Sequence, residues 1–197
     1  MAYEAKTFDY LLGLPGFSDQ LLKNHFTLYQ GYVANTNKLV DALNALMKEG
    51  KQASTEFAEM KRRFGWEFNG MRLHELYFGN MKKDSFSLSS DSRLRRMIIE
   101  AFGSLESWEA EFRATAAMRG IGWVILYYDP QSDRLFNCWI NEHDVGHLSG
   151  AAPLLVMDVF EHAFMLDYGT KRADYINAFF KAIDWDTVST RFDAAKE

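Results

Sequence analysis

Hydrophobic residues recur every three or four positions through the first part of the chain. The period runs over residues 18–47, where Ser18 is a suitable N-cap, and it returns over residues 54–64 and 73–78. Glycines interrupt it between the second and third stretches. The pattern predicts an extended lead-in, then one long amphipathic helix and two shorter helices that together form a helical hairpin layer.

The pattern changes after a polar, serine-rich stretch at residues 82–91. Residues 94–118 keep the helical period. Three apolar runs, at residues 123–128, 135–140 and 154–157, are typical of β-strands, and a polar turn joins the first two. The second half of the chain therefore predicts a layer that combines helices with a small sheet.

We place a domain boundary in the serine-rich stretch. Residues 1–84 are the expected N-terminal helical hairpin domain, and residues 85–197 are the expected C-terminal α/β domain. The expected fold class is α+β, with a three-stranded antiparallel sheet in the C-terminal layer and closing helices at residues 172–180 and 185–192.

Charge and cysteine content narrow the function classes. The formal net charge of −5 argues against non-specific binding to nucleic acid, because such binding needs clustered Lys and Arg side chains. The single cysteine, Cys138, excludes an intramolecular disulfide and fits a reducing compartment. No segment approaches the ~18 consecutive apolar residues of a membrane helix. We therefore expect a cytoplasmic protein that binds neither nucleic acid nor a membrane.

Charged residues follow directly on the third apolar run. Asp158, Glu161 and His162 come at the end of a strand expected to be buried, where a charge costs free energy unless it is paired, hydrogen-bonded or bound to a metal. An Asp and a His four residues apart can converge on one cation. They can equally form a buried Asp–His hydrogen bond that orients a helix start, and these residues alone leave both interpretations open.

Two further histidines lie on the inward faces of the predicted helices. His25 belongs to the first helix and His74 to the third, and either of them alone is more often a buried core histidine than a metal ligand. Taken with Asp158 and His162, they form a set of three imidazoles and one carboxylate. Such a set suits iron, manganese or zinc, whereas the single cysteine argues against a thiolate site.

Several segments resemble the iron/manganese superoxide dismutases. DVFEHAFMLDYGTKRADYINAFF, followed by IDWD, is similar to the signature region of that family, and NGMRLHELYFGNM to the helix that carries its second ligand. GSLESWEAEF and GIGWVILYYD match further landmarks in the same order, so the resemblance covers nearly the whole chain.

The resemblance implies one iron or manganese ion per subunit, held between the two layers by His25, His74, Asp158 and His162, with a solvent molecule as fifth ligand. The implied reaction is the disproportionation of superoxide to dioxygen and hydrogen peroxide, during which the metal cycles between its +3 and +2 states. Zinc would bind the same ligands but could not cycle.

Further roles follow from the same resemblance. Tyr32 matches a tyrosine at the entrance to the site, His143 a residue that hydrogen-bonds the metal-bound solvent, and Arg172 a basic residue near the substrate channel. Glu161 matches a residue that reaches across a dimer interface to the partner subunit's His162. The implied assembly is a homodimer or tetramer.

The chain departs from the usual family pattern near these residues. His25 and Tyr32 are seven positions apart, one fewer than is usual, which predicts that both face the site from a regular α-helix without a bulge. Tyr29 stands where a histidine is common, Met165 where a tyrosine is common, and Phe160 where a tryptophan is common. Details of proton relay and product inhibition in the family therefore do not transfer directly.

Two other functions are compatible with the same sequence. The first is a non-catalytic interaction module that keeps the fold, and the second is another mononuclear metal enzyme that uses the same ligands. The first predicts eroded ligands, yet all four ligand positions carry suitable side chains. Superoxide dismutase activity is therefore the preferred expectation.

Overall fold

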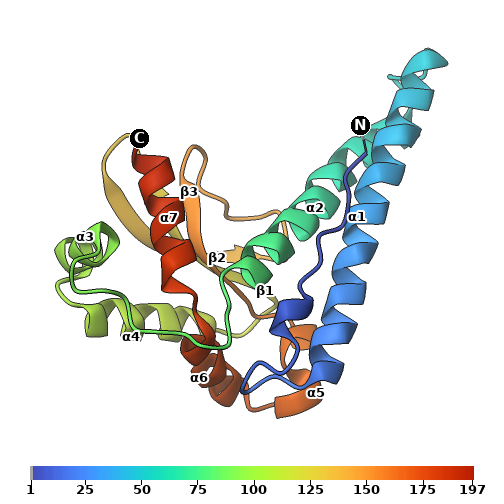
Figure 1. The fold of residues 1–197 in the computed structure, drawn as a ribbon. Helices are drawn as coiled ribbons and strands as arrows, with labels where there is room; N and C mark the ends of the chain where they lie inside the picture. The colour runs from blue at the N-terminus through green and yellow to red at the C-terminus, as the bar shows by residue number, and fades with distance from the viewer. Residues whose placement is uncertain (1) are drawn as a thin grey trace.

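The protein consists of a helical hairpin layer packed against an α/β layer (Figure 1). The structure is a computed structural model and describes residues 2–197. In chain order its elements are η1 (Asp9–Leu11), α1 (Asp19–Lys48), α2 (Thr55–Gly79), α3 (Arg93–Phe102), α4 (Leu105–Ala116), β1 (Gly122–Asp129), β2 (Arg134–Asn141), β3 (Ala152–Asp158), η2 (Glu161–Ala163), α5 (Met165–Tyr168), α6 (Arg172–Ala182) and α7 (Trp185–Lys196). The expected α+β architecture is confirmed.

Helices α1 and α2 lie side by side and extend well beyond the rest of the molecule (Figure 1). Serine caps begin both helices: the Ser18 side chain accepts a hydrogen bond from the Leu21 amide, and the Ser54 side chain accepts one from the Phe57 amide. The lead-in before α1 includes the short 3₁₀ helix η1, which the hydrophobic pattern did not predict.

The predicted interruption of the second helix is wrong, because α2 runs without a break for 25 residues. Gly65 and Gly70 both lie inside it, although glycine costs about 1 kcal/mol relative to alanine in a helix interior. Packing against α1 offsets this cost. At Gly70 the packing itself demands glycine, since an added Cβ would lie 2.6 Å from Cδ1 of Tyr32.

The three strands form one antiparallel sheet with the order β2-β1-β3, as expected. Strand β1 is central and almost wholly buried. Its register places Trp123 opposite Ile140 on β2 and opposite Asp158 on β3. Helix α7 and helix α2 both contact β3, so the end of β3 lies where the two layers meet.

A buried polar junction joins the hairpin to the α/β layer. Arg191 on α7 donates to the backbone carbonyls of Leu154 on β3, at 2.8 Å, and of Leu76 on α2, at 2.9 Å. The amide of Val156 donates to Asn80 Oδ1 at 2.8 Å. Burial lowers the pKa of Arg191 to about 10, which still leaves the guanidinium charged at neutral pH. These bonds fix α2 relative to β3, and both elements contribute side chains to the site described below.

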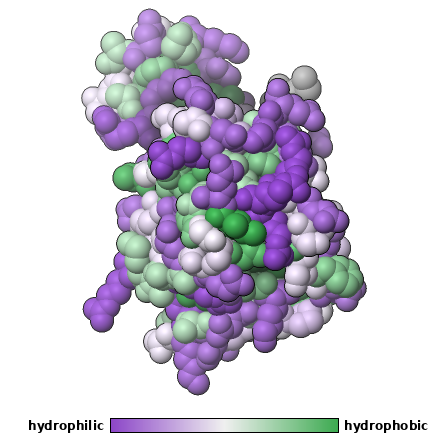
Figure 2. Space-filling view, turned by 90° about the vertical axis from the view of Figure 1, so that its left-hand side faces the viewer, coloured by the Kyte–Doolittle hydropathy of each residue, from purple (hydrophilic) through white to green (hydrophobic). Residues whose placement is uncertain are grey.

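Hydrophilic residues dominate the face shown in Figure 2, where hydrophobic residues gather only in small patches. Among the described residues, the most exposed large apolar side chain is Phe86, at 74%. It lies between α2 and α3, in the segment that joins the two layers. Within residues 2–197, no helix has both the length and the apolar character required to cross a membrane.

Candidate metal centre

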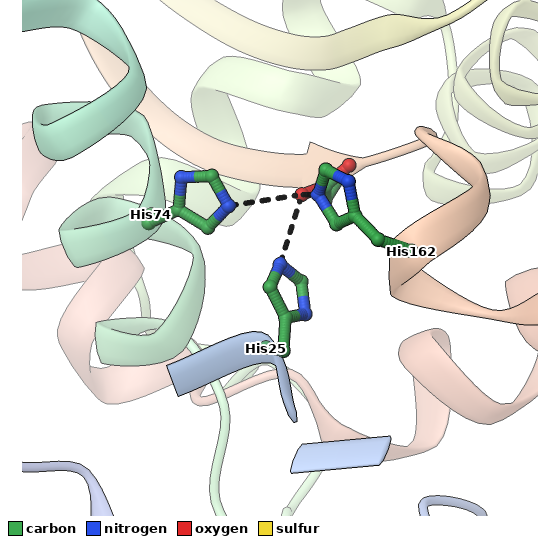
Figure 3. Close-up of side chains that lie close together, drawn as sticks. His25, His74 and His162 are labelled. Atoms are coloured by element: carbon green, nitrogen blue, oxygen red, sulfur yellow. Dashed lines mark hydrogen bonds and ion pairs between the residues drawn. The ribbon is translucent and has the colours of Figure 1, made fainter. Parts of the chain in front are cut away.

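Three histidines and one aspartate meet where the layers touch. His25 comes from α1, His74 from α2, Asp158 from the end of β3 and His162 from η2. One potential ligand atom of each lies within 4.8 Å of those of the other three. Figure 3 shows the three labelled rings converging on a common centre from separate segments. The four residues predicted from the sequence are thus brought together.

The carboxylate of Asp158 is the focus of this cluster. Its Oδ2 atom lies 3.2 Å from His25 Nε2, 3.0 Å from His162 Nε2 and 3.6 Å from His74 Nε2. Its Oδ1 atom accepts a hydrogen bond from the Phe160 amide at 2.8 Å, which fixes the orientation of the group. Burial would raise the pKa of Asp158, but the charge and hydrogen bond of His162 and those of His25 lower it overall, so the carboxylate is ionised.

His74 shows that this cluster is more than a set of Asp–His hydrogen bonds. Its Nδ1–H donates to the carbonyl of Gly70 at 2.6 Å, so in the neutral ring Nε2 carries a lone pair. Burial lowers the pKa of His74 well below its usual value, which keeps the ring neutral. The Nε2 atom is buried and has no hydrogen-bond partner among residues 2–197, the part of the chain that the structure describes.

A lone pair on His74 Nε2 therefore faces the ionised carboxylate of Asp158, and both side chains are fully buried. Two acceptors in that position repel each other unless a cation lies between them. Three imidazole nitrogens and one carboxylate oxygen form a donor set that suits iron, manganese or zinc. The residues present therefore fit a single metal ion.

A chain of hydrogen bonds lies beside the cluster. The indole of Trp123 donates to His143 Nδ1 at 3.0 Å, which requires that Nε2 of the neutral imidazole carry the hydrogen. That Nε2–H donates to the hydroxyl oxygen of Tyr32 at 2.8 Å. Burial lowers the pKa of His143 to about 4, so the ring stays neutral at physiological pH. The Tyr32 hydroxyl hydrogen has no acceptor among residues 2–197 and is available to a molecule in the site.

Tyr32 reaches the site from a regular helix, as the seven-residue spacing predicted. Helix α1 is α-helical throughout, and the Tyr32 ring stacks on His74 with centroids 5.2 Å apart. Tyr29, one turn before it, instead donates to the carboxylate of Glu75 at 3.0 Å. Burial raises the pKa of Tyr29 to about 12. Tyr29 thus belongs to the packing of α1 on α2.

Aromatic rings surround the Tyr32–His143 pair. Phe160 stacks on His143 with centroids 4.8 Å apart and on His162 at 5.0 Å. Trp66 on α2 lies edge-on to His143 at 4.4 Å, a neighbour that we did not predict. The spacing gave no clear signal, because eight residues on a regular α-helix place Trp66 roughly 80° around the helix axis from His74.

Arg172 and Glu161 lie outside this cluster. Arg172, at the start of α6, donates to the backbone carbonyls of Met118 at 2.6 Å and of Gly120 at 2.8 Å, on the loop before β1. Its guanidinium thus secures that loop, and its role in attracting substrate remains a prediction. Glu161 is exposed on η2, directly before the partly exposed His162.

Comparison with known proteins agrees with the donor set. Residues 90–191 match the family model described as iron/manganese superoxide dismutases, C-terminal domain. A protein named manganese superoxide dismutase 2, from Haloferax volcanii, is 36% identical over 200 residues, which cover 100% of this chain and 98% of that protein.

Two proteins named iron superoxide dismutase are also similar. The one from Aquifex pyrophilus is 40% identical over 92% of this chain and 87% of its own length. The one from Cupriavidus metallidurans is 37% identical over 92% of this chain and 91% of its own length. With these relatives, the matched C-terminal domain and a buried cluster suited to iron or manganese, the chain belongs to the iron/manganese superoxide dismutase family.

Proposed function

We propose that this protein disproportionates superoxide to dioxygen and hydrogen peroxide at one iron or manganese ion held by His25, His74, Asp158 and His162. The observation that carries the proposal is the buried lone pair of His74 Nε2, which faces the Asp158 carboxylate and needs a cation between them. Membership in the family then selects the reaction among those that such an ion could support.

The reaction consumes two superoxide anions and two protons and yields one dioxygen and one hydrogen peroxide. A bound iron or manganese ion supplies the one-electron chemistry, because both metals have accessible +3 and +2 states. The protein supplies a rigid donor set and a route for protons. Burial raises the pKa of Tyr32, with the charges of Asp158 and Glu67 acting in the same direction, so its hydroxyl remains a hydrogen-bond donor at neutral pH.

Metal reconstitution tests the proposed function against its rivals. The protein is loaded separately with iron, manganese and zinc, and superoxide removal is measured per bound ion. Activity with iron or manganese and none with zinc is the expected result, because zinc does not change oxidation state. Tight metal binding without superoxide removal would point to another metal enzyme, and failure to bind any of the three would point to a non-catalytic module.

Replacement of Tyr32 by phenylalanine is expected to lower superoxide turnover by about 10- to 100-fold, because the hydroxyl that His143 holds in place is lost. Metal content should be unchanged, since Tyr32 stacks on His74 without occupying a ligand position. Rapid-mixing measurements of superoxide decay, normalised to bound metal, check the prediction. Unaltered turnover in Tyr32→Phe would remove the hydroxyl from the proton route.

We also propose a homodimer or tetramer with Glu161 at the interface. Glu161 is exposed, and Met165 and Leu166 beside it expose 49% and 57% of their surface. The His162 side chain, unlike those of the other three cluster residues, is 27% exposed. Equilibrium sedimentation of Glu161→Ala should show a weakened assembly relative to wild type. A mass that stays monomeric in wild type at micromolar concentration would refute the assembly.

The remaining expectations complete the proposal. We place the domain boundary between residues 84 and 85, in a segment that has little regular secondary structure. Arg172 would add positive charge near the substrate channel, and the protein would act in the cytoplasm. Limited proteolysis in the joining segment would test the boundary, since a single early cut there is expected if the two parts are separate domains.

A further inference from the structure

Trp66 packs against both Tyr32 and His143, the two residues of the proposed proton route. Its ring lies 4.4 Å from the His143 ring and 5.6 Å from the Tyr32 ring, measured between centroids. It approaches from α2, whereas Tyr32 belongs to α1 and His143 to the loop that follows β2. Trp66 therefore contacts both members of the pair from the second helix of the hairpin.

The indole nitrogen of Trp66 is anchored on the opposite layer. Its N–H donates to Oε2 of Glu142 at 3.1 Å, a bond between residues 76 positions apart. Glu142 directly precedes His143, so the bond acts on the loop that carries the imidazole. Among residues 2–197, α2 makes no other hydrogen bond to this loop.

The backbone at Glu142 needs such an anchor. Its φ of 50° lies in the left-handed region, which disfavours side chains other than Gly, Asn and Asp. The turn is closed by the bridge between Asn141 and Val145, with Asn141 N to Val145 O at 2.8 Å, and the Glu142 amide also donates to the carbonyl of Ile121 at 3.2 Å. A strained residue next to His143 persists when tertiary contacts over-determine it, and the indole bond supplies one.

The outer face of the Trp66 ring is covered as well. The Arg63 guanidinium lies 3.7 Å from the ring centroid, a cation–π contact. Arg63 in turn donates to Oε1 of the buried Glu67 at 2.8 Å, so it is held over the ring. With Arg63, Tyr32 and His143 all packed against it, the indole has little freedom to rotate away from Glu142.

We propose that Trp66 and Glu142 are positioning residues that hold the hydrogen bond between His143 and Tyr32. The inference deepens the proposed function and rests on it for its effect on turnover. Neither residue touches the metal ligands through a polar contact recorded in the structure, so both act through the pair that they align. The bond also ties the loop after β2 to the helical hairpin across the layer boundary.

The test uses Trp66→Phe, which keeps a ring but removes the N–H, and Glu142→Ala, which removes the acceptor but keeps a Cβ and thus the backbone strain. Superoxide turnover per bound metal is expected to fall about three- to tenfold in each, because misalignment of a reacting group by a fraction of an ångström is costly. The double variant should be no slower than the slower single variant. Glu142→Gln retains an accepting oxygen and should keep most of the activity.

A second readout does not depend on turnover. In the zinc-loaded protein, which is diamagnetic, the hydrogen on His143 Nε2 can be followed by NMR. Its exchange with solvent should accelerate about tenfold in Trp66→Phe and in Glu142→Ala, since the bond to Tyr32 opens more often. If wild-type protein proved inactive with every metal, the proposed function would fail while this measurement still tested the positioning role.

Trp108→Phe is the matched control. Its indole also donates to a side chain on a different element, Asn137 Oδ1 at 3.0 Å, but this bond joins α4 to β2. We expect lower stability in this variant with unchanged turnover and unchanged exchange at His143. The inference is overturned if Trp66→Phe leaves both readouts at wild-type values, if Trp108→Phe alters them equally, or if the effects of Trp66→Phe and Glu142→Ala multiply.

Discussion

Replacement of Asp158 by alanine is expected to strip the protein of its metal and to lower superoxide turnover by more than about 100-fold. Loss of a residue that merely orients a ligand costs about 10- to 100-fold in metal affinity, so loss of a ligand should cost at least as much. Asp158 is also the only carboxylate of the cluster, and without it only three imidazoles would remain to face a cation.

Metal content by elemental analysis, together with turnover, checks this expectation. Asp133→Ala is a suitable control, because it removes a surface carboxylate that pairs with Lys196 at 2.7 Å and should leave both quantities unchanged. Far-UV circular dichroism shows whether the variant has kept its helices. A folded Asp158→Ala protein that retains stoichiometric metal would refute the assignment of this carboxylate as a ligand.

Gly70→Ala is the second change with a large expected effect. The new Cβ would lie 2.6 Å from Cδ1 and 2.8 Å from Cε1 of Tyr32, closer than carbon atoms approach, so the Tyr32 ring must move. Displacement of the ring would break its bond to His143 and its stacking on His74. We expect turnover to fall about tenfold or more and the free energy of unfolding to fall by about 1–3 kcal/mol.

Gly65→Ala provides a control on the same helix. No atom lies within 4 Å of a Cβ added at this position, so the substitution meets no steric obstacle. Because alanine favours helix more than glycine does, Gly65→Ala should stabilise the protein by about 0.5–1 kcal/mol and leave turnover unchanged. Urea denaturation and superoxide decay measure the two effects. Equal behaviour of the two alanine variants would show that contact with Tyr32 does not decide the outcome at residue 70.

Hydrophobic periodicity predicted the secondary structure correctly where a single period ran through a whole segment. The period of residues 18–47 predicted α1, and the three apolar runs predicted the strands, because burial of one face imposes a fixed spacing on apolar side chains. The prediction failed within α2, where Gly65 and Gly70 were expected to end one helix before the next began. Packing against α1 outweighs the weak intrinsic cost of glycine, and that packing is not visible in a local window.

Some features of the candidate site could be predicted from the sequence, and others could not. The four cluster residues and the Tyr32–His143 pair could be recognised from the motifs that carry them, since ligand identity and order along the chain are properties of the sequence. Three other features could not be recognised from the sequence. They are the lone pair on His74 Nε2, the free hydroxyl hydrogen of Tyr32 and the hydrogen bond from Trp66 to Glu142.

The sequence by itself determined which elements form and which side chains are available as ligands, because both depend on residue type and spacing. The tertiary structure alone decided which nitrogen of each imidazole is free, that Arg172 is bound to two backbone carbonyls, and that α2 is tied to the loop carrying His143. These features depend on contacts between residues far apart in the chain, and such contacts exist only once the two layers have packed together.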